Sequence, residues 1–196
     1  MLAKGYSVSA LTRPGSERKL PSGARAVVGN ALDEATFAGS IPRAATFVHL
    51  VGTPHPNPSK ATEFQRVDRV SIGAAIAAAR TAGVRHFVYV SVAHPAPIMR
   101  AYIAVRQEGE ALVTASGIPA TIVRPWYVLG PGHRWPLLLV PAYAILRRLP
   151  ATRDTAERLA LVTRDAMVAA LVRAVETPPA AGARIVDVPG IRRASQ

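Results

Sequence analysis

Short runs rich in β-branched and aromatic residues alternate with longer, alanine-rich runs along most of this chain. The predicted strands are Ser7–Leu11, Arg25–Val28, Thr46–Val51, His86–Ser91, Pro119–Val123 and Arg184–Val188. The predicted helices are Asp33–Phe37, Ala61–Ala82, Met99–Ser116, Leu137–Leu149 and Arg164–Glu176. Several strands are apolar throughout, as strands covered on both faces should be. The alternation predicts an α/β fold with a doubly wound, mainly parallel sheet.

The first residues restrict this fold further. The segment Leu2–Val8 has the pattern of a helix end, a stop at Gly5 and then a strand. In a doubly wound sheet ordered 3-2-1-4-5-6, the strand before that helix is the first one, which lies at the centre. We therefore expect a sheet that is missing its first, central strand. Ser7–Leu11 and Thr46–Val51 would then have unpaired edges, and the chain would have low stability.

Composition narrows the function classes. The 196 residues include no cysteine, which excludes a disulfide framework, a thiolate metal site and cysteine catalysis. The formal net charge of +12 indicates either a surface for nucleic acid or anionic lipid, or a coding bias towards arginine. Because the arginines are scattered and do not alternate with aromatic residues, we expect no nucleic-acid partner. The chain opens without a leader-like segment, so we expect a cytoplasmic protein.

The apolar run Leu137–Leu149 is too short to cross a bilayer. With Trp135 before it and arginines at its end, it could lie on a membrane surface, line a substrate pocket or form a contact between subunits. We favour the last two interpretations, and the oligomeric state stays open.

Motifs follow most of the predicted strands in a fixed order. They are Leu11-Thr12-Arg13-Pro14-Gly15-Ser16, Gly29-Asn30, Leu50-Val51-Gly52-Thr53, Tyr89-Val90-Ser91, Tyr102-x-x-x-Arg106 and Arg124-Pro125 with Gly130-Pro131-Gly132. In this order the chain resembles the extended or atypical branch of the NAD(P)-binding short-chain dehydrogenase/reductase superfamily, near its NmrA-like and epimerase/dehydratase-like members. The resemblance covers nearly the whole chain. It implies one Rossmann-like domain over residues 1–196, missing its glycine-rich βα unit, with a substrate-side region at about 126–165.

The resemblance assigns a nicotinamide cofactor to the strand ends. Arg13, helped by Ser16, would bind a 2′-phosphate, so NADP is expected and NAD remains possible. Asn30 stands where the family usually has an acid that touches adenine, while Gly52 and Thr53 would lie along the cofactor. The alternatives are that Arg13 is solvated and that Asn30 is a turn residue. We expect no metal, because His55 has no partner at ligand spacing.

The resemblance also implies a catalytic group and a substrate side. Ser91 would orient a substrate oxygen, Tyr102 would transfer a proton, and Arg106 would replace the usual lysine on the same helix face. Arg106 keeps the charge but cannot relay a proton. In the alternative, Tyr102 and Arg106 are an ordinary pair on a helix surface.

Pro125 would border the cofactor. The substrate-side residues would be Trp126, Tyr127, His133 and Trp135, although the tryptophans could also be plain core residues.

These features predict an oxidoreductase or epimerase-like enzyme that acts on a small carbonyl or alcohol substrate. The alternative is a non-catalytic NAD(P)H binder that serves as a sensor, an assembly factor or a partner subunit. Replacement of the family lysine weakens catalysis more than binding, and this keeps the alternative open.

Overall fold

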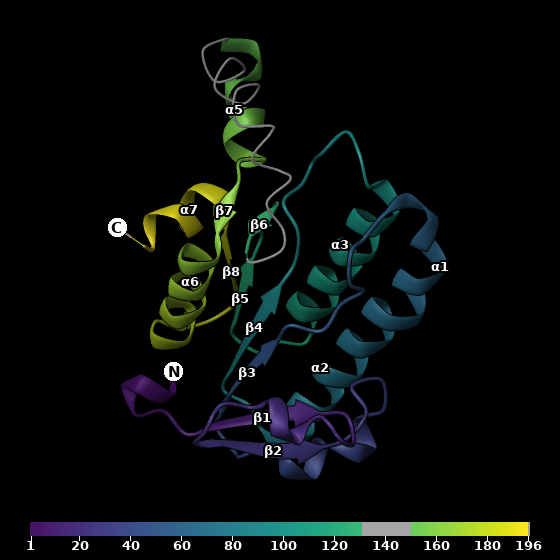
Figure 1. Cartoon of the computed structure of the whole chain (residues 1–196), viewed down its shortest axis with the longest axis vertical. Coiled ribbons are helices and arrows are strands. Elements are labelled where there is room, and N and C mark those ends of the chain that lie inside the picture. Colours follow the sequence, from purple (N-terminus) through teal and green to yellow (C-terminus); the bar gives the residue numbers. More distant parts are fainter. Residues whose placement is uncertain (131–149, 196) are drawn as a thin grey trace.

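The computed structural model describes residues 1–130 and 150–195 (Figure 1). The strands are β1 (Val8–Thr12), β2 (Ala24–Val28), β3 (Thr46–His49), β4 (His86–Val90), β5 (Ala120–Val123), β6 (Val128–Leu129), β7 (Val162–Thr163) and β8 (Ala183–Val186). The helices are α1 (Ala61–Glu63), α2 (Val70–Ala82), α3 (Arg100–Ala115), α5 (Pro150–Arg158), α6 (Arg164–Glu176) and α7 (Val188–Arg193). Short 3-10 turns are η1 (Leu2–Lys4), η2 (Glu17–Lys19), η3 (Glu34–Thr36), η4 (Ala38–Ser40) and η5 (Pro58–Lys60), and a π-helix, η6 (Phe64–Arg69), joins α1 to α2.

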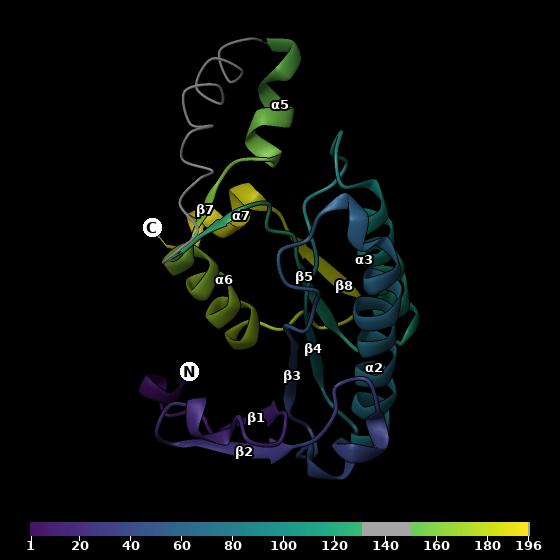
Figure 2. The same ribbon diagram turned by 45° about the vertical axis from the view of Figure 1, so that its right-hand side comes forward.

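Four strands form the main sheet, in the order β3-β4-β5-β8, and every neighbouring pair is parallel. This confirms the predicted α/β class and the parallel strands. Helices α2 and α3 cover one face of the sheet and α6 covers the other (Figure 2). Alternation along β4 divides the core accordingly: Phe87 and Tyr89 pack in the α2 cluster, whereas Val88 packs in the α6 cluster.

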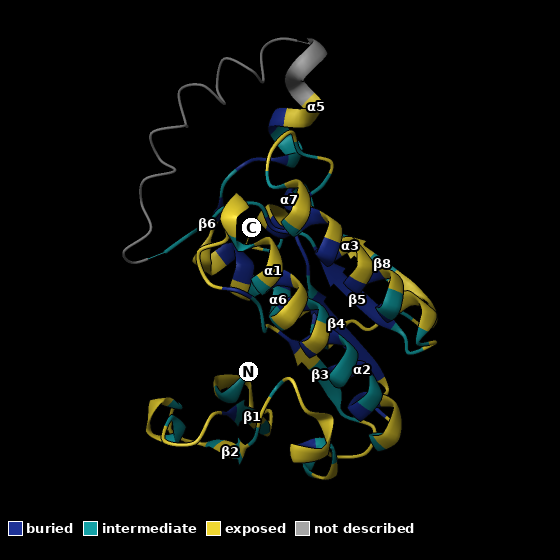
Figure 3. Cartoon of the chain, turned by 90° about the vertical axis from the view of Figure 1, so that its right-hand side faces the viewer, coloured by how far each residue is buried: buried dark blue, intermediate teal, exposed yellow. Residues whose placement is uncertain are grey.

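The strands β1 and β2 form a separate parallel pair that shares no ladder with the main sheet. Figures 1 and 2 place this pair beneath the main sheet, on the side where β3 and β4 begin. Buried residues are concentrated along β4 and β5 and are sparse in β1 and β2 (Figure 3). The pair therefore contributes little to the hydrophobic core.

All six predicted strands are confirmed, with ends that differ by at most two residues. The predicted helix Ala61–Ala82 is also present, and Gly83 ends it in a left-handed conformation at φ 66°. The π-helical turn within it was not predicted, nor were α5, α7 and the two-residue strands β6 and β7. The predicted helix Leu137–Leu149 lies outside the described residues. Within residues 1–130 and 150–195, every helix is too short or too polar to cross a membrane.

Candidate functional site

The carboxyl ends of β3, β4 and β5 meet one face of α3. Ser91 directly follows β4, Thr53 lies beyond the end of β3, and Arg124 directly follows β5. Helix α3 presents Tyr102, Arg106 and Glu110 at intervals of four residues, and such residues lie one above the other on a helix. Parallel strands and this spacing together bring the predicted catalytic residues to one edge of the sheet.

Arg106 is buried rather than open to a ligand, with 6% of its surface exposed. Its Nη2 lies 2.7 Å from Asp68 Oδ1, and the Asp68 side chain has no exposed surface. Its Nη1 donates to the backbone oxygen of Val90 at 3.1 Å and, more weakly, to that of Val51 at 3.5 Å. The guanidinium thus ties α3 to η6 and to the ends of β3 and β4.

Asp68 reaches Arg106 because the π-helix η6 turns its carboxylate inward. The backbone nitrogen of Thr53 donates to Asp68 Oδ2 at 3.0 Å, and the Thr53 hydroxyl donates to the same oxygen at 2.6 Å. Thr53 was expected to lie along a cofactor. In the structure, its backbone nitrogen and its hydroxyl both donate to Asp68. π-Helical turns within α-helices are frequent at functional sites.

Gly52 also has a clear contact. A Cβ atom added there would collide with Arg106 Nη2 and would lie 3.1 Å from Asp68 Oδ1. The glycine was predicted to allow close approach of a ligand, and the structure shows that it allows close approach of Arg106.

Tyr102 lies between aromatic and charged neighbours. Its ring centroid is 5.0 Å from that of Phe64, and Arg106 Cζ lies 5.1 Å from the Tyr102 ring. Burial raises the pKa of the Tyr102 phenol above its ordinary value; Arg106 lowers it in part, and Asp68 raises it again. The expected stabilisation of a phenolate by Arg106 is therefore outweighed.

Ser91 forms a hydrogen bond with a second buried acid, Glu110. Its hydroxyl donates to Glu110 Oε1 at 2.5 Å. Arg124 binds both oxygens of the same carboxylate, with Nε 2.9 Å from Oε1 and Nη2 at Oε2. His94 Nε2 lies 3.4 Å from Oε2. Because a serine hydroxyl has one hydrogen, Ser91 in this state can accept a hydrogen bond from a ligand but cannot donate one.

A second candidate site lies on the β1–β2 pair. A hollow of about 430 Å³ is lined by Arg13, Pro14, Gly29, Asn30 and Thr36. Two predicted cofactor residues, Arg13 and Asn30, thus line one hollow, and Ser16 is not among its lining residues. Asn30 Oδ1 also accepts a hydrogen bond from Leu32 N at 3.0 Å, as the turn interpretation expected.

On the substrate side, Pro125 is buried and its oxygen accepts from Ala93 N at 2.8 Å. Trp126 and Tyr127 pack edge to face with centroids 5.4 Å apart, and Trp126 also contacts the α6 core cluster. The predicted residues His133 and Trp135 lie outside the described residues. His55 is an exposed loop residue with φ 48°.

The structure does not bring the two sites together. The hollow belongs to the β1–β2 pair, beneath the main sheet, whereas Ser91 and Tyr102 lie towards the carboxyl ends of the main strands. No residue is shared between the lining of the hollow and the Arg106 cluster. No ladder hydrogen bond holds β1 in the main sheet, so its orientation is not fixed by strand pairing.

Asp68 and Glu110 are neighbours of the site that sequence reasoning missed, whereas Arg124 was part of the Arg124-Pro125 motif but was given no role. Glu110 carried a usable signal, because it is four residues beyond Arg106 on the same helix face. Asp68 carried none, since its inward direction depends on the π-helical turn.

Comparisons with solved structures give the fold. The protein gox2253 matches with a TM-score of 0.65 and 20% identity, over 95% of this chain and 64% of that chain. A short-chain dehydrogenase/reductase superfamily protein from Agrobacterium tumefaciens with bound NAD matches with a TM-score of 0.66 and 18% identity, over 98% and 75%. The Bordetella bronchiseptica enzyme WbmH in complex with NAD⁺ matches with a TM-score of 0.67 and 19% identity, over 95% and 68%.

The chain thus spans 64% of gox2253, and it spans 61% of a nucleoside-diphosphate-sugar epimerase from Staphylococcus aureus. No curated protein matches it. The sequence profile described as NAD(P)H-binding matches residues 1–134, which is more than half of the chain. The parallel α/β sheet agrees with this match, and the chain belongs to the NAD(P)H-binding family.

Proposed function

We propose that this protein binds NADP(H) and acts as an oxidoreductase or epimerase-like enzyme on a small carbonyl or alcohol substrate. The observation that carries the proposal is that the buried cation Arg106 contacts the Tyr102 ring and also binds the oxygen of Val90, the residue before Ser91, at the carboxyl end of β4. Ligands of open α/β sheets bind at this edge. When bound, the dinucleotide supplies or accepts a hydride.

The chain's own residues have distinct roles in this proposal. The Tyr102 hydroxyl donates or accepts the proton at the substrate oxygen, and Ser91 accepts a hydrogen bond from a hydroxyl group of the substrate or of the alcohol product. Arg106 and Asp68 fix the end of α3 against β3 and β4. Arg13 selects the 2′-phosphate of NADP from the separate hollow.

The reaction requires one dinucleotide to contact both the Arg13 hollow and the Tyr102 cluster. We propose that an additional strand and helix hold these two parts in the required positions. An uncovered apolar surface supports this. Val48 pairs with the buried Val88 and yet is 38% exposed, and Leu50, two residues on, is 62% exposed. On α6, Val168 is 53% exposed.

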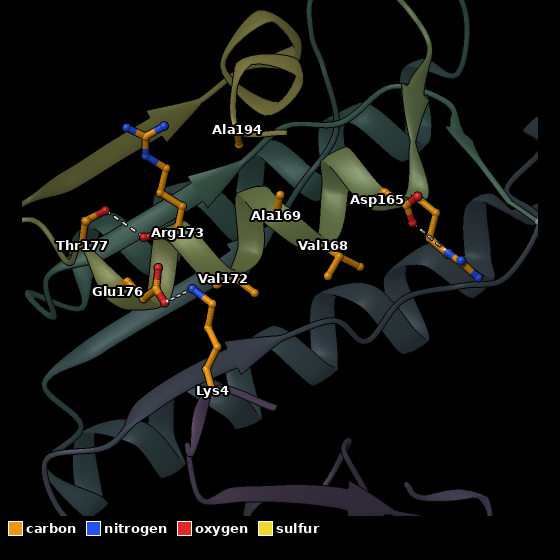
Figure 4. Close-up of a pocket in the computed structure, with 10 residues that line it drawn as sticks. Lys4, Asp165, Val168, Ala169, Val172, Arg173, Glu176, Thr177 and Ala194 are labelled. Atoms are coloured by element: carbon orange, nitrogen blue, oxygen red, sulfur yellow. Dashed lines mark hydrogen bonds and ion pairs between the residues drawn. The ribbon is translucent and has the colours of Figure 1, made fainter. Parts of the chain in front are cut away.

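A hollow of about 800 Å³ lies along α6 beside this surface (Figure 4). Val168, Ala169 and Val172 line it, and the ion pair of Lys4 with Glu176 at 2.6 Å connects η1 to α6 at one end. A strand between β1 and β3, followed by a helix against α6, would cover this surface and pair both open edges. Such a unit corresponds to the first, central strand and the glycine-rich turn that the family resemblance implies.

Val168→Asp tests the added unit. In residues 1–196 alone, this exposed substitution should change the free energy of unfolding by less than about 0.5 kcal/mol. In a longer protein that carries a preceding βα unit, it should cost about 1–3 kcal/mol, because the carboxylate would be buried. Equal effects in both proteins, measured by urea unfolding, would contradict the proposed unit.

A non-catalytic NAD(P)H binder is the second candidate function. The specific observation in its favour is that Asp68 pairs with Arg106 and that Glu110 accepts the hydrogen bond of the Ser91 hydroxyl. Both predicted catalytic helpers of Tyr102 therefore have partners inside the protein.

Substrate turnover separates the two functions. A longer protein that carries the proposed βα unit should be saturated with NADPH and screened against carbonyl compounds, with Tyr102→Phe as the control. Turnover that Tyr102→Phe abolishes supports the enzyme. Tight NADPH binding without turnover supports the binder.

A further inference from the structure

Arg106 has a single carboxylate partner among the described residues, and that partner is completely buried. Asp68 lies 2.7 Å from the guanidinium, and the exposed fractions of the two side chains are 0% and 7%. The guanidinium also faces the rings of Tyr102 and Tyr89, at 5.1 and 5.9 Å. Two phenols therefore share one cation whose charge is largely offset by one carboxylate.

Two other titratable neighbours of the cluster, His49 and Tyr89, are uncharged at neutral pH. Burial, helped by the charge of Arg106, lowers the pKa of His49 on β3 to about 3. Burial raises the pKa of Tyr89 on β4 to about 12. Among the described residues, the charges that act on Tyr102 are thus Arg106 from α3 and Asp68 from η6.

We propose that Asp68 is a positioning residue that holds the Arg106 guanidinium beneath Gly52 and offsets its positive field at Tyr102, so that Tyr102 serves as a proton donor. The contacts around the Asp68–Arg106 pair support this role. Gly52 leaves room for Nη2, Thr53 fixes the carboxylate with two hydrogen bonds, and Asp68 holds the guanidinium.

The physical reason lies in the cost of burying charge. Arginine cannot lose its proton in a protein, so a buried guanidinium without a carboxylate is strongly unfavourable. The pairing removes that cost, and it also reduces the attraction that would favour a phenolate at Tyr102.

The inference rests on the proposed function and assigns it a direction. A phenol at neutral pH can donate a proton, which is the step that reduction of a carbonyl requires. The substrate carbonyl carbon receives a hydride, with NAD(P)H as the reductant, and the carbonyl oxygen receives the Tyr102 proton. The product is an alcohol, and water then returns a proton to Tyr102.

The test is a pH titration of Tyr102, followed by NMR of ¹³Cζ-labelled tyrosine in the full chain, with Tyr102→Phe to assign the signal. It needs neither cofactor nor substrate, so its result is independent of whether the proposed enzyme activity exists. Asp68→Asn should lower the pKa of Tyr102 by about one unit or more, because Arg106 then acts unopposed. An unchanged or raised pKa in Asp68→Asn would overturn the inference.

Glu108→Gln is the matched control. Arg69 and Glu108 join the same two elements, η6 and α3, through an exposed ion pair of 3.3 Å. Loss of this pair should leave the pKa of Tyr102 unchanged. An equal shift in the control would show that loosening α3, rather than the charge of Asp68, moves the pKa.

A second comparison applies if Asp68→Asn does not fold. Arg106→Gln removes the cation and leaves the Asp68 carboxylate as the charge that acts on Tyr102. The pKa of Tyr102 should therefore rise more in Arg106→Gln than in the double variant Asp68→Asn/Arg106→Gln. Equal rises in both would overturn the inference.

Discussion

At the scale of single residues, the segment after β3 needs a residue without a side chain at position 52. Gly52 lies against the Arg106 guanidinium, which is held by Asp68 and by the Val90 oxygen. Ordinarily the end of a long side chain yields easily to a new methyl group. Here, moving it would break a buried ion pair, and this makes the position sensitive.

Gly52→Ala should therefore destabilise the protein by about 1–3 kcal/mol, the usual cost of overpacking. The measurement is urea unfolding followed by circular dichroism. Gly39→Ala is the control, because a Cβ atom at Gly39 meets no atom within 4 Å. Equal free energies of unfolding for the two variants would contradict the reading of Gly52 as a packing position.

Two buried histidines predict how the free energy of unfolding changes at acidic pH. Burial lowers the pKa of His49 to about 3 and that of His86 to about 4, from an ordinary value of 6.5. The unfolded chain binds protons at these residues near pH 6.5 and the folded chain does not. Stability should therefore be fully present above pH 6.5 and fall as the pH drops towards 4, by about 1.4 kcal/mol for each pKa unit.

His86→Gln can keep a hydrogen bond to Thr121, whose hydroxyl lies 3.0 Å from His86 Nε2. The variant should flatten the fall in the free energy of unfolding between pH 6.5 and 4, measured by urea unfolding at several pH values. An unchanged slope would show that His86 does not stay neutral in the folded protein.

Among the residues of the candidate site, local spacing decided what sequence could predict. Tyr102 and Arg106 could be found because four residues along a helix bring two side chains to one face. Asp68 lies far from Arg106 in sequence, and its direction depends on a π-helical turn inside an apparently regular helix. The partners of Ser91 and Thr53 could not be predicted for the same reason: they come from other elements.

At the scale of elements, the close approach of α3 to β4 depends on Gly109. A Cβ atom there would collide with the Tyr89 hydroxyl and lie 2.9 Å from its Cζ atom. Tyr89 is 1% exposed and packed within the α2 cluster, so the ring has no free space to enter.

Gly109→Ala should cost about 1–3 kcal/mol in thermal or urea unfolding, although alanine is the better helix former. Gly73→Ala in α2 is the control, since its nearest neighbour, Arg69 Nη1, lies at an ordinary 3.7 Å. That change should be neutral or stabilising by up to about 1 kcal/mol. A stabilising Gly109→Ala would contradict the packing described for α3.

The strands β4 and β5 were predictable because both of their faces are covered, which selects continuous apolar runs such as His86–Val90. The placement of β1 and β2 was not predictable in detail. The reason is that no ladder hydrogen bond joins the β1–β2 pair to the main sheet, so the residues of these two strands do not fix its position.

At the scale of the whole molecule, the central question is whether the chain carries a nucleotide site. The residues that line the Arg13 hollow lie close together: two directly follow β1, two directly follow β2, and Thr36 lies in η3. Preference for the 2′-phosphate should therefore be measurable on residues 1–196, even where the total affinity is low.

The most direct measurement is the dissociation constant of NADPH and of NADH, by isothermal titration calorimetry of the protein and of Arg13→Ala. The account predicts that NADPH binds at least about tenfold more tightly than NADH, which is about 1.4 kcal/mol, and that Arg13→Ala removes the difference. Equal dissociation constants in the unsubstituted protein, or a preference that survives Arg13→Ala, would contradict it.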